Sequence, residues 1–145
     1  MEIKGNLGYL LHHISFVLAR QSDQVLQEQL GIGFSQFKIL LILEQANGLP
    51  QKQIAVKLGQ TEASISRQIK LLQDNGMLSS QVSPVNRREH ITTLTPKGVK
   101  VTEKAMEILN NYHHPIFNKL SERQQAQLRE LLTTMHEAIC HGQDH

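Results

Sequence analysis

The sequence contains no tryptophan, few aromatic residues of any kind and a single cysteine. With aromatic residues at only 4%, leucine and isoleucine must fill the core. Because Cys140 is the only cysteine, an internal disulfide is excluded, and nothing indicates secretion. No apolar run approaches the roughly 18 residues of a membrane span, and residues 1–14 lack the apolar stretch of a signal peptide. These absences predict a cytoplasmic protein without a membrane partner.

Sequence motifs that carry enzyme chemistry are also missing. There is no Gly-rich phosphate loop, no nucleophile elbow, no pair of carboxylates on one helix face and no Cys–His dyad by spacing. We therefore expect a protein that is not an enzyme and that needs no cofactor.

The charge of this 145-residue chain is distributed unevenly. Residues 47–100 contain eight Lys or Arg against three acids, a net charge of +5, although the whole chain carries only +2. Residues 1–46 and 101–145 are slightly acidic, at −1 and −2. This asymmetry marks the middle of the chain as the part that faces an anion such as DNA.

Residues 53–78, QIAVKLGQTEASISRQIKLLQDNGML, predict two short helices joined by a tight turn. Gly59 ends the first helix, and Thr61 is placed to cap the second. On the second helix Ile65, Ile69 and Leu72 recur at helical spacing and predict a buried face. The other side carries small, hydroxyl-bearing and basic residues, which suit base edges and phosphates in a DNA major groove. An ordinary helical corner is the alternative. The candidate DNA-binding residues here are Thr61, Ala63, Ser64, Ser66, Arg67, Gln68 and Lys70.

After Gly76 the pattern changes to two short stretches rich in Val, Ile and Thr, residues 77–82 and 90–94. The segment between them, SPVNRRE, contains turn residues, so the whole predicts a β-hairpin. A helix-turn-helix followed directly by such a hairpin is a winged helix. At its tip Arg87 and Arg88 are candidates to hold a phosphate backbone or to enter a minor groove.

Apolar periodicity predicts further helices on both sides of this region. One spans residues 6–30, and Ser35 is expected to cap the next one. Pro50 suits the first turn of the helix that follows. Thr95 and Pro96 are expected to begin a later helix that Pro115 bends or ends. Ser121 and Gln124 form a capping box for a final helix, whose apolar side contains Leu128, Leu131, Leu132, Met135 and Ile139.

The predicted fold is mainly α with a small β-hairpin wing. A winged helix-turn-helix DNA-binding domain occupies residues 34–100, and dimerisation helices occupy residues 1–33 and 101–145. A small winged domain cannot cover the apolar faces of the long terminal helices. We therefore expect them to pair with a second copy, so that two recognition helices meet neighbouring turns of a palindromic site.

The sequences QKQIAVKLGQTEASISRQIKLLQDNGML and SPVNRREHITTLTPKG resemble the MarR family of bacterial transcriptional regulators. The resemblance implies a homodimer that binds double-stranded DNA at a pseudo-palindromic operator, usually as a repressor. It also implies a pocket between the dimer helices and the DNA-binding lobe, where a small-molecule effector such as an aromatic acid releases the DNA. The matching residues are Ala55, Leu58, Ser64, Ser66, Arg67, Leu72, Gly76, Arg87, Arg88, Leu94, Thr95, Lys97 and Gly98.

Two departures from the family pattern are the wing residues and Pro50, which stands where a hydroxyl cap is common and has little expected functional consequence. Ser83 and Asn86 stand in a wing where the family often has Asp, which can fix the tip arginines by a charged hydrogen bond. Arg87 and Arg88 are therefore expected to be looser before DNA binds. Family members that sense peroxides use a cysteine near the start of the first helix, whereas Cys140 lies at the other end of this chain. Sensing through a thiol by that route is not expected.

Two further sets of residues suggest binding sites. Tyr9, His12, His13 and Phe16 on the first helix are candidate ligand-lining residues, with core packing as the alternative. The chain has eight histidines, and a zinc site needs three or four such groups to converge from different helices. Scattered histidines packed between helices are favoured, so no metal ligand is predicted. The alternatives kept open are a metal-responsive regulator that uses these histidines and a winged helix that binds protein, which would have a neutral wing.

Overall fold

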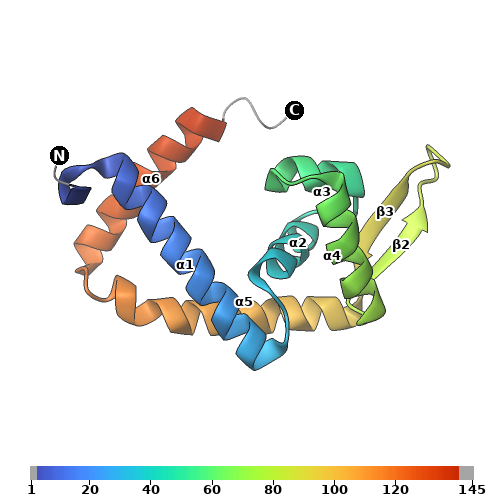
Figure 1. Cartoon of the computed structure of the whole chain (residues 1–145), viewed down its shortest axis with the longest axis horizontal. Helices are drawn as coiled ribbons and strands as arrows, with labels where there is room; N and C mark the ends of the chain where they lie inside the picture. The colour runs from blue at the N-terminus through green and yellow to red at the C-terminus, as the bar shows by residue number, and fades with distance from the viewer. Residues whose placement is uncertain (1–2, 141–145) are drawn as a thin grey trace. The chain divides into compact units, whose positions relative to one another are not determined.

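The computed structural model describes residues 3–140, which are mainly helical with one small antiparallel sheet (Figure 1). A short 3-10 helix, Ile3–Gly5, precedes the first long helix. The elements are α1 (Leu7–Leu30), α2 (Phe34–Gln45), β1 (Leu49–Pro50), α3 (Gln51–Leu58), α4 (Glu62–Asp74), β2 (Leu78–Val82), β3 (His90–Leu94), α5 (Pro96–Phe117) and α6 (Glu122–Cys140). The predicted fold class, helices with a winged helix-turn-helix, is confirmed.

The chain divides into two compact units, one that ends at Leu109 and one that begins at Asn110. The first unit contains α1 to α4, the sheet and the beginning of α5. The second unit is the end of α5 followed by α6. The functional boundaries expected from the sequence, with dimerisation helices flanking residues 34–100, stay a prediction.

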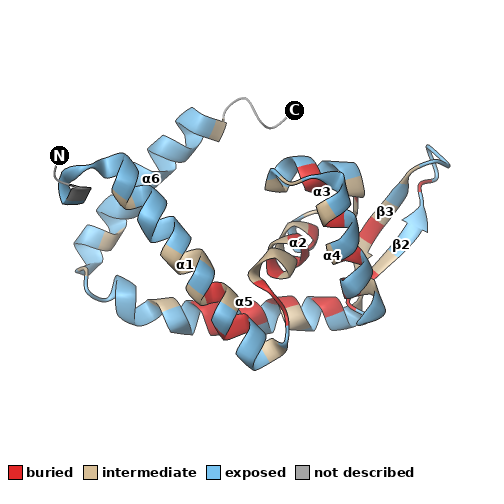
Figure 2. Ribbon diagram, in the orientation of Figure 1, coloured by how far each residue is buried: buried red, intermediate tan, exposed pale blue. Residues whose placement is uncertain are grey.

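The first unit has a continuous apolar core (Figure 2). The second half of α1 contributes Val25 and Leu26, and α2 contributes residues along most of its length. α5 closes the core with Ala105, Ile108 and Leu109. The most buried apolar side chains are Leu26, Ile32, Ile39, Leu40, Ile54, Ile65, Leu72 and Ala105. As the composition predicts, aliphatic side chains fill most of this core, and Phe37 is the one aromatic residue among its described buried members.

The junction between α1 and α2 differs from the prediction. Ser35 does not cap α2, because Gly33 holds the cap position and Ser35 already lies in the helix. The Gln36 side chain accepts a hydrogen bond from the Gly33 N–H at 3.0 Å. Asp23, on α1, accepts one from the Phe34 N–H at 2.9 Å. A carboxylate distant in the sequence thus supplies an acceptor at this helix start, and local sequence gives no sign of it.

The sheet has three strands in the order β1-β3-β2, one more than the predicted hairpin. β1 pairs with β3 through Leu49–Thr92 and Pro50–Ile91. Pro50 therefore ends a strand and occupies the N-cap position of α3 without a capping hydrogen bond, instead of lying in the first helical turn. Proline has no N–H to donate, so an edge strand is a position that it tolerates in a sheet.

The second unit is a pair of helices joined by a short turn. α5 does not end at Pro115 but continues to Phe117, and Asn118 N–H still donates to the His114 carbonyl at 2.9 Å. The capping box predicted for α6 is present. Ser121 N–H donates to Gln124 Oε1 at 2.9 Å, and Gln124 N–H donates to Ser121 Oγ at 3.2 Å.

Candidate nucleic-acid interface

The helix-turn-helix is built as its sequence predicts. Gly59 ends α3 with a left-handed backbone, at a φ of 62°, which glycine adopts without a steric penalty. Thr61 Oγ1 then accepts a hydrogen bond from the Ser64 N–H at 3.1 Å and caps α4. Ile65, Ile69 and Leu72 are buried along one face of α4. This stripe fixes the rotation of α4, the expected recognition helix, and therefore determines which of its side chains face outward.

The outward face of α4 carries the predicted basic residues. Successive helical residues are about 100° apart, so Ala63, Arg67 and Lys70 share a side opposite the buried stripe. All three are exposed, as are Thr61 and Ser66. Two other candidates, Ser64 and Gln68, are half-buried. The Ser64 hydroxyl also donates to Gln60 Oε1 at 3.4 Å.

One residue on this face escapes sequence reasoning. Leu71 is 50% exposed, although Leu72 beside it is buried. At helical spacing it follows Ser64 and Arg67 on the same side of α4. A leucine in a helix is normally assigned to the core, and the only sign against that assignment in the sequence is its position outside the apolar stripe of α4.

The wing places its two arginines at the centre of a tight turn. Glu89 N–H donates to the Asn86 carbonyl at 3.0 Å, which makes Arg87 and Arg88 the two middle residues of that turn. Both side chains are exposed. Within residues 3–140 the ion pair is between Lys104 and Glu107, at 3.4 Å, and none involves these arginines. Their positive charge is therefore not compensated by a neighbouring carboxylate in the described part of the chain.

Neutral side chains hold the backbone of the wing tip. Ser83 is only 6% exposed, and its hydroxyl oxygen accepts hydrogen bonds from Val85 N–H and Asn86 N–H. The Asn86 side-chain oxygen accepts one from Arg88 N–H at 3.1 Å. The structure therefore refines the expected looseness of the tip. The two arginine side chains have no carboxylate partner there, but the backbone that carries them is well supported.

The end of α4 is fastened to the start of α5. Thr95 Oγ1 donates to the Gly76 carbonyl at 2.6 Å, and Lys97 Nζ donates to the Asn75 carbonyl at 2.7 Å. A Cβ at Gly98 would collide with the carbonyl oxygen of Met77. Thr95 also caps α5 as expected, since its hydroxyl oxygen accepts a hydrogen bond from Gly98 N–H at 3.1 Å. The segment LTPKG thus secures the end of the recognition helix.

The four candidate ligand-lining residues lie in the first half of α1. Tyr9, His12, His13 and Phe16 are all exposed, and the rings of Tyr9 and His13 stack at 5.6 Å. Their role in ligand binding stays a prediction.

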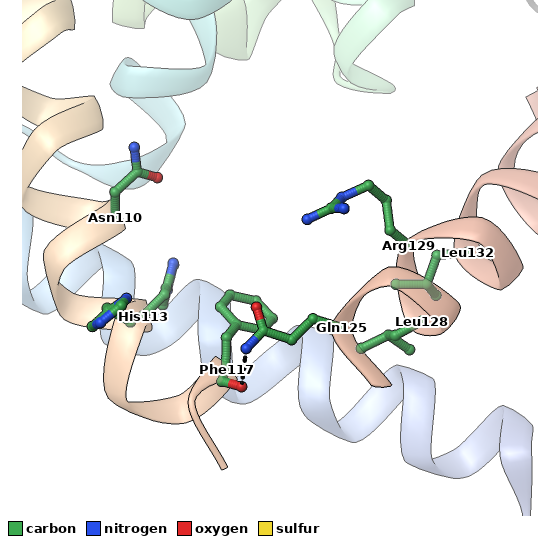
Figure 3. A pocket seen from close by; sticks show the side chains of 8 residues that line it. Asn110, His113, Phe117, Gln125, Leu128, Arg129 and Leu132 are labelled. Atoms are coloured by element: carbon green, nitrogen blue, oxygen red, sulfur yellow. Dashed lines mark hydrogen bonds between the residues drawn. The ribbon is translucent and has the colours of Figure 1, made fainter. Parts of the chain in front are cut away.

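A cavity of about 360 Å³ lies within the second unit, between the end of α5 and α6 (Figure 3). Phe117, Leu128 and Leu132 supply apolar surface, and Arg129 extends from α6 into the space between the helices. Gln125 donates to the Phe117 carbonyl at 2.9 Å across this turn. Burial lowers the pKa of His113 on the α5 side. Sequence reasoning did not identify this cavity, because its walls meet only when the two helices fold back on each other.

Two kinds of feature are absent among the described residues, a cluster of metal-ligating side chains and a membrane-spanning helix. Within residues 3–140, no three His, Cys, Asp or Glu side chains gather closely enough to hold a metal ion. None of the helices in this range combines the length and apolar content needed to cross a membrane.

Known proteins with the same organisation are DNA-binding regulators. The MarR family model matches residues 34–90, the segment from α2 to the start of β3. A transcriptional repressor of the helix-turn-helix type from Mycobacterium tuberculosis is 25% identical over 87% of this chain and 90% of its own length.

Solved structures of MarR-family regulators have the same fold as this chain. Apo MarR from E. coli superposes with a TM-score of 0.83 at 22% identity, covering 90% of this chain and 96% of that one. MepR from S. aureus, solved as a DNA complex, has a TM-score of 0.76 at 28% identity, covering 92% and 98%. The family comprises transcriptional regulators rather than enzymes. This chain belongs to the MarR family and is a DNA-binding transcriptional regulator with a winged helix-turn-helix.

Proposed function

We propose that this regulator is a cytoplasmic homodimer that represses transcription from a pseudo-palindromic operator. The observation that carries the proposal is the outward face of α4. Its exposed Arg67 and Lys70 stand opposite the buried stripe, and the wing adds two exposed arginines. These side chains lie in the part of the chain with a net charge of +5. The apolar side of α4 packs on the protein core, and its basic side is free to enter a DNA major groove.

Each DNA-binding candidate has an expected role. Ser66 and Arg67 face base edges in the major groove, since hydroxyls and guanidinium groups can hydrogen-bond them. Lys70 contacts a phosphate, and Arg87 and Arg88 hold the flanking backbone or minor groove. Leu71 is suited to an apolar contact with a thymine methyl group. The remaining candidates near the start of α4 are Thr61, Ala63, Ser64 and Gln68.

The homodimer is supported by apolar surface that the single chain leaves uncovered. On α1, Leu7, Ile14 and Phe16 are more than half exposed. On α6, no residue is buried, and its apolar side faces solvent from Leu128 to Ile139. Exposed apolar area costs about 25 cal/mol for each Å². A second copy that covers these helices would bury this apolar surface, and the resulting dimer would present two copies of α4 to DNA.

Release by a small molecule belongs to the same proposal. A compound bound between the dimer helices and the DNA-binding lobe would favour a spacing of recognition helices that does not match one DNA turn. Tyr9, His12, His13 and Phe16 remain the candidate lining residues. Small aromatic acids are the first compounds to test, because the family resemblance implies them.

The decisive experiment measures binding to fluorescent duplexes from the DNA next to the gene, at several salt concentrations. Each phosphate contact contributes about 0.9 to the slope of log affinity against log salt. Arg88→Ala should therefore weaken binding to all duplexes and lower the slope by about 1.8 in a dimer. Arg67→Ala should also relax the base preference, if Arg67 touches a base.

Lys104→Ala is the matched control, since it removes the same charge from an exposed ion pair on α5. It should leave affinity and slope close to those of the wild type, because exposed pairs contribute little. If Arg88→Ala also matches the wild type, the wing does not contact DNA.

A further inference from the structure

The wing tip contains a more complete hydrogen-bond network than its sequence suggests. Ser83 N–H donates to the Glu89 carbonyl at 2.8 Å and closes the base of the loop. Glu89 N–H donates to the Asn86 carbonyl at 3.0 Å and closes the tight turn at its tip. No described residue other than glycine has a positive φ, so the turn types that require one at Arg87 or Arg88 are excluded. The arginines therefore occupy ordinary backbone conformations.

Two uncharged side chains complete this network from inside the loop. Ser83 Oγ accepts from Val85 N–H at 3.2 Å and from Asn86 N–H at 3.3 Å. Asn86 Oδ1 accepts from Arg88 N–H at 3.1 Å. The two acceptors form a chain of hydrogen bonds, because Ser83 accepts from the backbone of Asn86 and Asn86 accepts from the backbone of Arg88.

The side chains that accept hydrogen bonds in this loop are uncharged, and its two arginines have no carboxylate partner in the described part of the chain. Among residues 83–89, only Arg87, Arg88 and Glu89 are charged. Neither arginine forms an ion pair within residues 3–140. A carboxylate at either acceptor position would support the same backbone, but it would also attract the arginines that are needed for phosphates.

We propose that Ser83 and Asn86 are positioning residues, which order the wing before DNA arrives without neutralising Arg87 and Arg88. This inference rests on the proposed function, in which the wing contacts DNA. An ordered loop loses less conformational entropy on binding than a mobile one, so it binds more tightly with the same contacts. Uncharged acceptors leave both guanidinium groups available to phosphate oxygens.

The first test removes the hydroxyl acceptor of Ser83 and leaves the charge of the wing unchanged. In Ser83→Ala, the amide hydrogens of Val85 and Asn86 should exchange faster with solvent in the free protein, as measured by NMR. A net hydrogen bond corresponds to about a five-fold change in an equilibrium constant. The long bonds from Val85 N–H and Asn86 N–H share one acceptor oxygen, so we count them as one net hydrogen bond. DNA binding should therefore weaken by about five-fold for each wing, or about 25-fold in the dimer. The salt slope should not change, because no phosphate contact is lost.

The second test keeps the acceptor and adds a charge. Asn86→Asp has nearly the same shape and still accepts from Arg88 N–H, so the exchange of that amide should stay slow. Affinity for DNA should fall, and the salt slope should decrease by about 0.9 for each arginine contact that the carboxylate neutralises. Asn86→Ala, at an exposed position, provides a second loss of the acceptor if Ser83→Ala lowers the stability of the fold.

Ser80→Ala is the control, because Ser80 is an exposed serine on β2 with no side-chain role in the turn. It should match the wild type in amide exchange and affinity. If Arg88→Ala weakens DNA binding but Ser83→Ala and Asn86→Ala change neither exchange nor affinity, the positioning role is wrong. If Arg88→Ala itself has no effect, the proposed contact between wing and DNA fails instead.

Discussion

Gly98 shows how a single residue decides the geometry of the recognition helix. The carbonyl oxygen of Met77 occupies the space that a Cβ at this position would need. Gly98→Ala should therefore push α5 away from the end of α4. We expect a loss of about 1–3 kcal/mol in the free energy of unfolding, as for other overpacked sites. Chemical denaturation of the variant and the wild type would measure it.

Gly5→Ala is a suitable comparison for this substitution, because a Cβ at Gly5 meets no atom within 4 Å. It should leave the free energy of unfolding nearly unchanged. If both variants unfold at the denaturant concentration of the wild type, the close approach between Gly98 and Met77 is not part of the stable fold.

His113 should make stability depend on pH. Its ring lies 5.8 Å from that of Tyr112 and 6.3 Å from that of Phe117, and burial lowers its pKa. The folded protein therefore favours the neutral ring, whereas a histidine in the unfolded chain binds a proton near pH 6.5. As the pH falls through about 6.5 toward the lower folded pKa, the unfolded state binds more protons and stability decreases.

His113→Gln should reduce this loss of stability, because glutamine does not titrate. Thermal unfolding at about pH 7.5 and about pH 5.5 provides the measurement. The prediction is wrong if the melting temperature of the variant falls between these two values as steeply as that of the wild type.

At the scale of one element, the cap of α4 determines how the recognition helix begins. Thr61 Oγ1 is the acceptor for Ser64 N–H. Thr61→Ala should remove it and lower the free energy of unfolding by about 1 kcal/mol, which is typical for the loss of such a cap. Thr61→Ser retains the hydroxyl and should keep most of the stability. Equal losses in the two variants would show that the methyl group, rather than the cap, accounts for the effect.

Elements with a local signal were predicted from the sequence, and elements that depend on distant partners were not. The stripe of Ile65, Ile69 and Leu72 and the glycine after α3 were sufficient to predict the helix-turn-helix. β1 was missed because it has two residues and exists only through its pairing with β3. The start of α2 was misassigned because the acceptor for Phe34 N–H comes from Asp23 on another helix.

In the candidate site, too, features with a local signal in the sequence were predicted, and features that depend on the folded backbone were not. The exposure of Arg67, Lys70 and the wing arginines agrees with the helical period and the hairpin pattern. The support of the wing by Ser83 could not be predicted, because the direction of a hydroxyl in a loop depends on the folded backbone. Lys97 and Gly98 match the family pattern, but only the structure explains them, through contacts at the end of α4.

For the whole molecule, the central prediction concerns assembly. Leu131 on α6 is 64% exposed in the single chain and lies on the apolar side of that helix. Leu131→Glu should place a charge in the proposed interface, shift the protein to monomers and lower its affinity for a two-site operator. Light scattering after gel filtration would give the mass.

Thr133→Glu adds the same charge to another side of α6 and is the control for this test. It should remain dimeric and bind DNA as the wild type does. A wild-type protein that is monomeric at micromolar concentration, or a Leu131→Glu variant that is still dimeric, would contradict the assignment of α6 to the interface.

The pairing of β1 with β3 has a consequence for how the protein folds. The residues that form the helix-turn-helix, α3 and α4, lie in the chain between these two strands, so the pairing of Leu49 with Thr92 closes a long loop around them. Contacts between residues far apart in the sequence form slowly, because the entropy of loop closure must be overcome first. We therefore expect α3, α4 and the β2–β3 hairpin to form first, and β1 to join the sheet last.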